Sequence, residues 1–205
     1  MVMEKCEGFP LSGLGRYRVI LASGSPRRRE LLSMLGVDFE VIPAPVDNED
    51  YPPSLPAEEI AEYLAVKKSE ACRFGSDALV ITADTLVIAG DRVLGKPENA
   101  AHAREMLGIL SGNTHKVVTG VAVSTAQGMR SFRAVTEVTF APLTAQETEW
   151  YISSCRPFDK AGSYGIQEWI GCIGVTSING SYYNVMGLPL HRLYTLLKEI
   201  CDSQL

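Results

Sequence analysis

A run of three arginines follows a small Ser-Gly-Ser turn early in the chain, in the segment Ser23 to Arg29. Ser25 suits the capping position of a helix, and Pro26 suits its first position, where a missing N–H costs no hydrogen bond. Cations in the first turn of a helix oppose its dipole, at a cost of roughly 0.3–1 kcal/mol each. Guanidinium forks and free helix amides both bind phosphate oxygens. The segment therefore predicts a polyphosphate site; arginines paired with acids on a solvated surface are the alternative.

A single carboxylate, Asp84, follows the apolar run Ala78 to Ala83. Such a run is typical of a strand buried on both faces in an α/β sheet. A buried carboxylate must be paired, protonated or bound to a metal. If the strand ends here, Asp84 and Thr85 lie at its carboxyl end, where open α/β sheets bind ligands. Asp84 is the first candidate for a metal ligand or a general base, with a capping or turn role as the alternative.

A two-residue turn, Gly90-Asp91, predicts a hairpin that returns the segment Gly95-Lys96-Pro97 toward Asp84. Gly95 permits close approach of the backbone, and Lys96 offers a point charge to a phosphate oxygen. The spacing is not that of a P-loop.

Two other side chains have both a functional and a structural interpretation. Gln167, after the glycine-flanked pair Ser163-Tyr164, carries an acceptor and two donors that suit the edge of a base. A glutamine bonded to strand backbone is the alternative. His115, placed before an apolar strand, suits a catalytic base less well than a structural or exposed role.

These side chains need a scaffold of alternating strands and helices, and periodicity and capping signals predict one. A capping box at Thr144 and Glu147 opens one of the helices. The expected strands cover 17–22, 39–43, 78–83, 86–89 with its hairpin partner 92–94, 115–123, 131–140 and a pair about Asn179-Gly180, and the expected helices 26–36, 57–72, 98–110, one from 144 and one ending near Ile200. The pattern favours one α/β domain.

Bulk composition limits the class of protein. With 205 residues, 46% hydrophobic and 21% charged, the chain can bury a sizeable core. Its net charge of −5 argues against a general nucleic-acid surface. Five widely spaced cysteines without a CxxC pair favour the reducing cytoplasm. We find no signal peptide or membrane span, and expect residues 1–16 to form a loose extension before a domain at 17–205.

The motifs together resemble the Maf family of nucleoside triphosphate pyrophosphatases. The resemblance extends in order from about Tyr17 to Ile200. It rests on the segments Leu21 to Arg28, Ala83 to Thr85, Gly95 to Pro97, Leu110 to Gly112 with His115, Tyr164 to Gln167 and Gly187 to Pro189. It implies a single elongated α/β domain with a mixed, strongly twisted sheet flanked by helices, a cleft between two lobes, and commonly a homodimer.

The resemblance also implies an activity. Members hydrolyse a nucleoside triphosphate between its α and β phosphates with a divalent metal, Mg²⁺ or Mn²⁺. By position, Asp84 matches the base and a metal ligand, and Asp47 weakly matches a second acidic residue. Arg27 and Thr85 match substrate-determining positions, and Arg28, Lys68 and Lys96 match phosphate contacts. The form Tyr164 to Gln167 is similar to the subgroup acting on dTTP and UTP, in which Gln167 would read the pyrimidine.

One departure leaves base preference open. Many relatives have glycine after the glutamine, whereas Glu168 and Trp169 follow it here. Two other functions are alternatives: a pyrophosphatase for modified nucleotides, and a nucleotide-binding regulator of cell division without turnover. The carboxylate among cations favours turnover.

Overall fold

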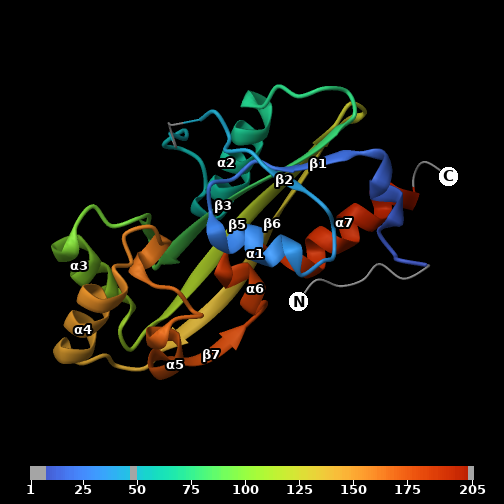
Figure 1. Ribbon diagram of the computed structural model, residues 1–205. Coiled ribbons are helices and arrows are strands. Elements are labelled where there is room, and N and C mark those ends of the chain that lie inside the picture. Colours follow the sequence, from blue (N-terminus) through green and yellow to red (C-terminus); the bar gives the residue numbers. More distant parts are fainter. Residues whose placement is uncertain (1–7, 47–49, 203–205) are drawn as a thin grey trace.

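A mixed sheet of seven strands is the frame of the molecule (Figure 1). The computed structural model describes residues 8–46 and 50–202. The strand order is β2-β1-β3-β5-β6-β7, with β4 paired to β3 off this path, and only the β1 pairs with β2 and β3 are parallel. The strands are β1 (Arg18–Leu21), β2 (Glu40–Val41), β3 (Ala78–Ala89), β4 (Arg92–Leu94), β5 (Thr114–Thr125), β6 (Gly128–Phe140) and β7 (Val175–Asn179).

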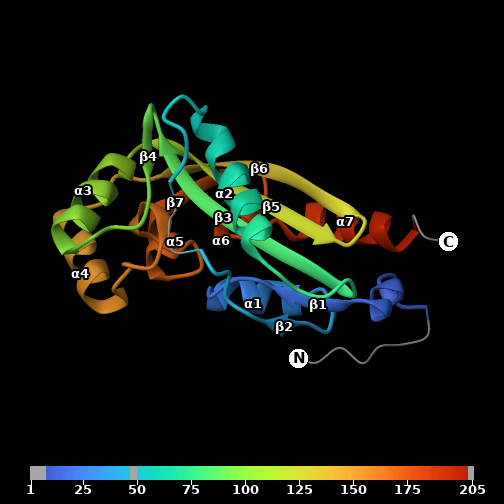
Figure 2. The same cartoon turned by 90° about the horizontal axis from the view of Figure 1, so that it is seen from above.

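Helices cover this sheet, which confirms the predicted α/β class with a mixed sheet flanked by helices. The α-helices are α1 (Pro26–Ser33), α2 (Ala57–Ala71), α3 (Ala100–Leu110), α4 (Ala145–Cys155), α5 (Trp169–Gly174), α6 (Tyr182–Met186) and α7 (Leu190–Asp202), and the 3-10 helices are η1 (Ser12–Arg16) and η2 (Ala161–Ser163). α2 packs on β3 and β5, and α6 packs on β5 and β6. α3 and α4 pack together at one end of the molecule, and η1 packs on α7 at the other (Figure 2).

The contact between α2 and the sheet depends on a glycine. A Cβ added to Gly120 in β5 would lie 2.3 Å from the carbonyl carbon and oxygen of Ala61 and from Cα of Glu62. Gly120 is buried and pairs across the ladder with Asp84 of β3. The missing side chain therefore lets α2 lie directly against β5, next to the strand β3 that carries Asp84.

Several local predictions were wrong for identifiable reasons. β3 does not end at Asp84, because the ladder with β5 continues on both sides of that residue. The second strand expected after Asn179-Gly180 is instead helix α6, because Gly180 turns the chain at φ +133° and Ser181 caps the helix. The helix expected over 26–36 ends at Ser33, and Met34, just past its last residue, is 47% exposed.

The first described residues pack against the end of the chain. Leu11 and Leu14 are buried, and the Arg16 guanidinium donates to the carbonyl oxygens of Ile200 at 3.0 Å and Cys201 at 3.1 Å. Residues 9–16 are thus packed rather than loose, while a domain boundary at residue 17 stays a prediction.

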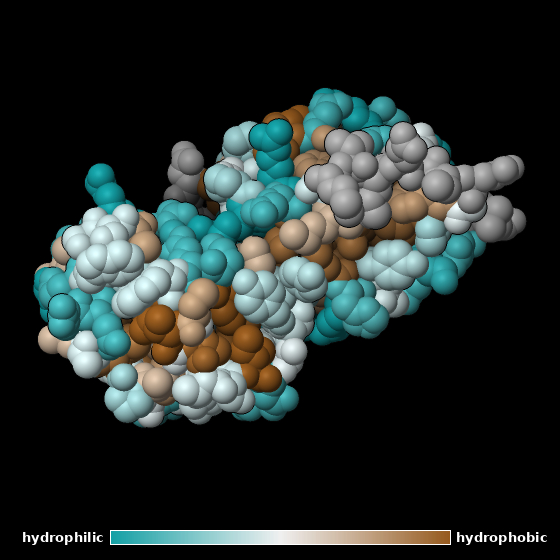
Figure 3. Space-filling model, turned by 60° about the horizontal axis from the view of Figure 1, so that its bottom comes forward, coloured by the Kyte–Doolittle hydropathy of each residue, from teal (hydrophilic) through white to brown (hydrophobic). Residues whose placement is uncertain are grey.

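The surface is polar over much of the face in Figure 3, but hydrophobic residues gather over the end that carries α5 and β7. Trp169, Ile173 and Ile178 are exposed there, and the Trp150 ring packs on Trp169 with centroids 4.5 Å apart. Among the described residues, no helix is both long and apolar enough to cross a membrane.

Candidate functional site

The turn between β1 and α1 forms as its sequence predicts. The Ser25 side chain accepts a hydrogen bond from the backbone amide of Arg28, and Pro26 occupies the first helical position. The Ser25 amide in turn donates to Oγ of Ser23 at 3.2 Å. Helix α1 therefore begins at a short capped turn, which places its arginines near the carboxyl end of β1.

Arg28 is fixed by groups from distant parts of the chain. Its Nε donates to the carbonyl oxygen of Gly187 at 2.9 Å, and its Nη2 donates to Oγ1 of Thr85 at 3.0 Å. Oγ1 of Thr85 also lies 3.0 Å from Oγ1 of Thr119, which donates to the carbonyl oxygen of Asn184. Gly187 ends α6 at φ +112°, a conformation that disfavours a side chain. The guanidinium is thus positioned by β3 and the end of α6 together.

Asp84 forms a buried ion pair with a lysine of α2. Nζ of Lys68 lies 2.5 Å from Oδ1 of Asp84, and the two side chains are 13% and 8% exposed. The attraction between such charges is stronger in a low-dielectric site than in water, and it offsets the cost of burying them. The pair leaves a carboxylate and an ammonium side by side at the wall of a cleft.

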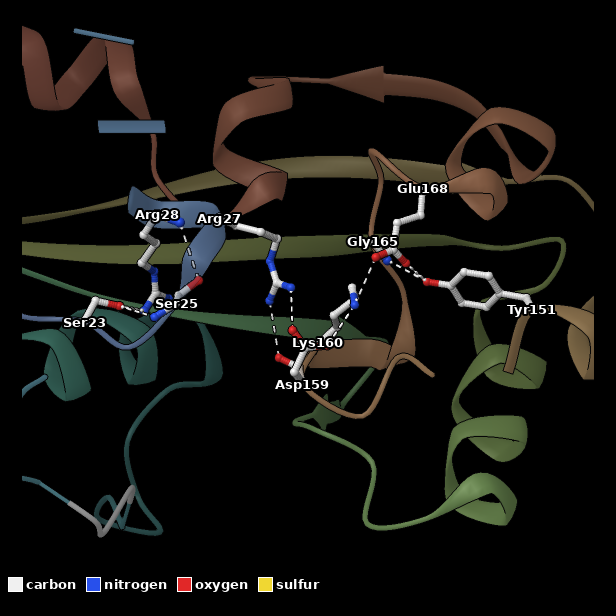
Figure 4. Close-up of polar contacts among 9 residues, drawn as sticks. All are labelled: Ser23, Ser25, Arg27, Arg28, Tyr151, Asp159, Lys160, Gly165 and Glu168. Atoms are coloured by element: carbon white, nitrogen blue, oxygen red, sulfur yellow. Dashed lines mark hydrogen bonds and ion pairs between the residues drawn. The ribbon is translucent and has the colours of Figure 1, made fainter. Parts of the chain in front are cut away.

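Arg27 is joined to the segment before η2 (Figure 4). Its Nη1 donates to Oδ2 of Asp159 at 2.7 Å, and Oδ1 of Asp159 accepts from Nζ of Lys160 at 2.8 Å. Burial disfavours the charged carboxylate, but hydrogen bonds from Lys160 and Arg27 and their charges outweigh it and lower the pKa of Asp159 to about 2. Asp159 is therefore ionised at neutral pH and holds both cations.

The segment that contains Gln167 is held in place by Tyr151 of α4. The Tyr151 hydroxyl accepts from the Gly165 amide at 3.1 Å and donates to Oε2 of Glu168 (Figure 4). Burial, with the hydrogen bond and charge of Glu168, raises the pKa of Tyr151, which keeps it a phenol. A Cβ at Gly165 would lie 2.9 Å from Cδ of Glu168 and 3.1 Å from Nε2 of Gln167. Gly165 thus lets both side chains fold back over the turn.

One cleft of about 410 Å³ brings the predicted site residues together. Its described lining includes every predicted residue except one: Arg27, Arg28, Lys68, Asp84, Thr85, Lys96 and Gln167. The exception is Asp47, which lies outside the described residues. Among the described residues the lining carries five cationic and two anionic side chains, so the cleft attracts a polyanion.

Two lining residues, Asp159 and Lys160, had no assigned role in the sequence analysis. They follow Phe158 and precede the small-residue run Ala161 to Ser163, and adjacent opposite charges of this kind are common on surfaces. Lys160, however, is only 7% exposed. The glycine-rich segment after them was the available signal, because it marks backbone that passes close to other groups.

His115 has a structural position rather than a catalytic one. It is 2% exposed in β5, its Nε2 lies 2.8 Å from the Tyr164 hydroxyl, and its ring meets Phe140 edge-on. The described lining of the cleft does not include it. Burial lowers the pKa of His115 to about 4, so the imidazole is neutral at physiological pH.

We expect this histidine to make stability depend on pH. The unfolded chain binds its proton near pH 6.5, whereas the folded protein binds it only near 4, so unfolding is favoured as the pH falls through that interval. The stabilisation present above pH 6.5 should fall by about 3 kcal/mol toward pH 4. Chemical denaturation of the wild type and His115→Phe measures this. The difference between the two free energies of unfolding should change across pH 4–6.5, and a constant difference would contradict the assignment.

Comparison with known proteins agrees with this geometry. The family model described as "Maf-like protein" matches residues 18–200. The chain is 56% identical to a dTTP/UTP pyrophosphatase of Phocaeicola vulgatus over 93% of this chain and all of the relative. It is 49% identical to a dTTP/UTP pyrophosphatase of Porphyromonas gingivalis over 94% of this chain and 99% of the relative. Among solved structures, a HAM1 protein from Coxiella burnetii is similar, with a TM-score of 0.51, 15% identity, and coverage of 89% of this chain and 99% of that one. The last likeness concerns the fold alone.

Proposed function

This chain belongs to the Maf family, and we propose that it hydrolyses dTTP and UTP between the α and β phosphates. The products are the nucleoside monophosphate and pyrophosphate. The observation that carries the proposal is the Asp84–Lys68 pair in a cleft with an excess of cations. A site for binding alone gains nothing from a carboxylate placed beside a triphosphate, whereas hydrolysis needs a group that takes a proton from water.

Three cations of the cleft are suited to the triphosphate. Arg28 presents a planar fork from the start of α1, and Lys68 and Lys96 provide point charges from α2 and from the chain after β4. In the transition state, negative charge is spread over the oxygens of the transferred phosphoryl group, so positioned cations supply most of the stabilisation.

Asp84 is suited to activate the attacking water. The bond between water oxygen and phosphorus forms, the bond to the leaving pyrophosphate breaks, and Asp84 takes the proton of the water. Lys68, 2.5 Å from Oδ1 of Asp84, orients the carboxylate. Lys68 also lines the cleft, so this lysine is suited to contact both the carboxylate of Asp84 and a phosphate of the substrate.

A divalent cation fits this site as part of the substrate complex. Within the described residues, no three His, Cys, Asp or Glu side chains gather. One carboxylate beside a phosphate site suits Mg²⁺ or Mn²⁺, since Mg²⁺ is commonly held by one or two carboxylates together with substrate phosphates and water. Asp84 would be the protein ligand, with Asp47 as a weaker second candidate. The cation would neutralise phosphate charge.

The other end of the cleft is suited to the base. Gln167 lies in the turn that Tyr151 anchors, and its amide carries the donors and acceptor that complement a pyrimidine edge. Arg27 and Thr85 flank the same cleft as substrate-determining residues. Action in the cytoplasm and assembly as a homodimer stay predictions.

Pyrophosphate release from a panel of nucleoside triphosphates tests this function. With Mg²⁺ or Mn²⁺, we expect turnover of dTTP and UTP in preference to dCTP and the purine nucleotides. Gln167→Ala should lower kcat/KM for dTTP by about tenfold, the value of roughly one lost hydrogen bond, and change the purine nucleotides little. Gln127→Ala, in the exposed turn after β5, is the matched control.

Each outcome has a clear interpretation. Equal losses on all nucleotides in Gln167→Ala would contradict a base-reading role. Binding of dTTP without release of pyrophosphate would support a regulatory nucleotide-binding protein instead. Turnover of modified nucleotides in clear preference to dTTP and UTP would replace the proposed substrates.

A further inference from the structure

Lys160 is a buried cation in the same part of the cleft as Gln167. Its residue is 7% exposed, and it lines the cleft together with Gly165 and Gln167. Nζ lies 2.8 Å from Oδ1 of Asp159 and 3.0 Å from Oε1 of Glu168. Lysine is almost never buried to this degree unless paired, so the two carboxylates account for how the ammonium is retained there. These ion pairs do not explain why a cation lies in the lining of the cleft at this position.

Glu168 acts on Lys160 and not as an acceptor for substrate. One carboxylate oxygen, Oε1, faces the Lys160 ammonium, and the other, Oε2, accepts from the Tyr151 hydroxyl. Tyr151 is itself fixed by the Gly165 amide. Glu168 therefore ties the ammonium to the turn that holds Gln167, so the departure from glycine at this position has a structural purpose.

The ammonium keeps one donor for another partner. A lysine ammonium has three N–H groups and no acceptor. Among the described residues, the carboxylates of Asp159 and Glu168 are the acceptors that it meets. The third N–H group belongs to an ammonium that lines the cleft and whose position is fixed by its ion pairs with Glu168 and Asp159. It suits an acceptor oxygen of the ligand and is unsuited to a donor.

We propose that Lys160 is a further specificity-determining residue that donates a hydrogen bond to the 4-carbonyl oxygen of thymine or uracil. Glu168 and Tyr151 are its positioning residues. The proposal deepens the proposed function and rests on it, because it places the base beside Gln167. Thymine and uracil carry an acceptor oxygen at position 4, whereas cytosine carries an amino donor there. A donor-only ammonium therefore selects the keto pyrimidines and opposes cytosine.

A cycle that changes both protein and ligand tests this contact. The ligands are α,β-methylene dTTP and the same compound with hydrogen in place of the 4-oxygen, and the proteins are wild type and Lys160→Met. Calorimetry measures the four affinities without turnover. We expect the wild type to prefer the 4-oxo ligand by about 10- to 100-fold, as for a hydrogen bond to a charged group. In Lys160→Met this preference should fall by at least about tenfold, because any part of it that comes from Gln167 is the same in both proteins.

Further variants separate contact from folding. Lys160→Met leaves the carboxylate of Glu168 without its cation. If this single variant is unstable, Lys160→Met/Glu168→Gln removes both charges. Glu168→Gln and Tyr151→Phe should reduce the preference for the 4-oxo ligand while the affinity for the 4-hydrogen ligand stays unchanged, a split that general destabilisation does not produce. Lys116→Met removes a lysine that is ion-paired with Glu58 outside the cleft and is the matched control.

The results distinguish failure of this proposal from failure of the proposed function. Preference for the 4-oxo ligand that persists in Lys160→Met and in the double variant would overturn the role of Lys160, whether or not dTTP is hydrolysed. A wild type without preference between the two ligands would overturn it as well. Absence of pyrophosphate release from dTTP by a wild type that shows the full cycle would overturn turnover alone.

Discussion

Asp84→Asn should lower kcat for pyrophosphate release by about 10²- to 10⁴-fold while the protein stays folded, the usual contribution of a general base. The amide of asparagine has nearly the shape of the carboxylate but cannot take a proton from water. It also removes the charge that faces Nζ of Lys68 at 2.5 Å. Because the cleft carries further cations that suit the phosphates, KM for dTTP should change much less than kcat. Steady-state release of pyrophosphate measures both.

The control must separate chemistry from stability. Asp91→Asn changes an exposed carboxylate at the turn of the same hairpin, and we expect wild-type activity there. Breaking a buried ion pair can cost about 3–5 kcal/mol, so the free energy of unfolding of Asp84→Asn should be measured as well. Lys68→Met/Asp84→Asn removes both charges and should regain stability but not activity. Near-normal turnover in a folded Asp84→Asn protein would rule out Asp84 as the base.

Gly120→Ala should destabilise the protein by at least about 3 kcal/mol, at the upper end of what overpacking costs. The new methyl group would lie 2.3 Å from backbone atoms of Ala61 and Glu62, and backbone cannot rotate away as a side chain can. Helix α2 must then lift from β5, and Lys68 on that helix moves relative to Asp84 on the neighbouring strand. We expect loss of turnover along with stability. Thermal and chemical denaturation measure the first effect.

Gly108→Ala is the matched control. Gly108 lies on the exposed face of α3, and a Cβ there meets nothing within 4 Å. This substitution should stabilise the protein by about 0.5–1 kcal/mol, because alanine loses less conformational freedom in a helix than glycine. If Gly120→Ala proved as stable as the wild type, α2 would have room that the packing described above does not allow.

Local chemistry made much of the fold predictable. The cap at Ser25 with Pro26 and the capping box of Thr144 and Glu147 act within a single helical turn, so the sequence alone predicts them. The failures lie where distant segments decide. Strand β3 continues beyond Asp84 because β5 pairs with it, and no residue near Asp84 indicates that partner.

The candidate site likewise contains residues that the sequence indicates and residues that only the fold reveals. The motif residues around Arg28, Asp84 and Lys96 could be identified because their types are unusual in their local context. The roles of Asp159 and Lys160 depend on Arg27 and on Glu168 and thus on contacts across the fold. The positions of these residues in the sequence do not indicate which groups they contact. Burial of Lys160 could be recognised only in three dimensions.

The long strands beneath the cleft also limit how the protein can move. The ladder of β3 and β5 is continuous from the pair Val80 and Ser124 to the pair Ile88 and Lys116, and β6 pairs with β5 over its whole length. No hinge can open between the two ends without breaking these hydrogen bonds. Amide hydrogens near Asp84 and Gly120 should therefore exchange with solvent only when the whole molecule unfolds, at the slowest rates in the protein. Any change in the shape of the cleft is therefore confined to side chains and loops around it, above strands that stay rigid.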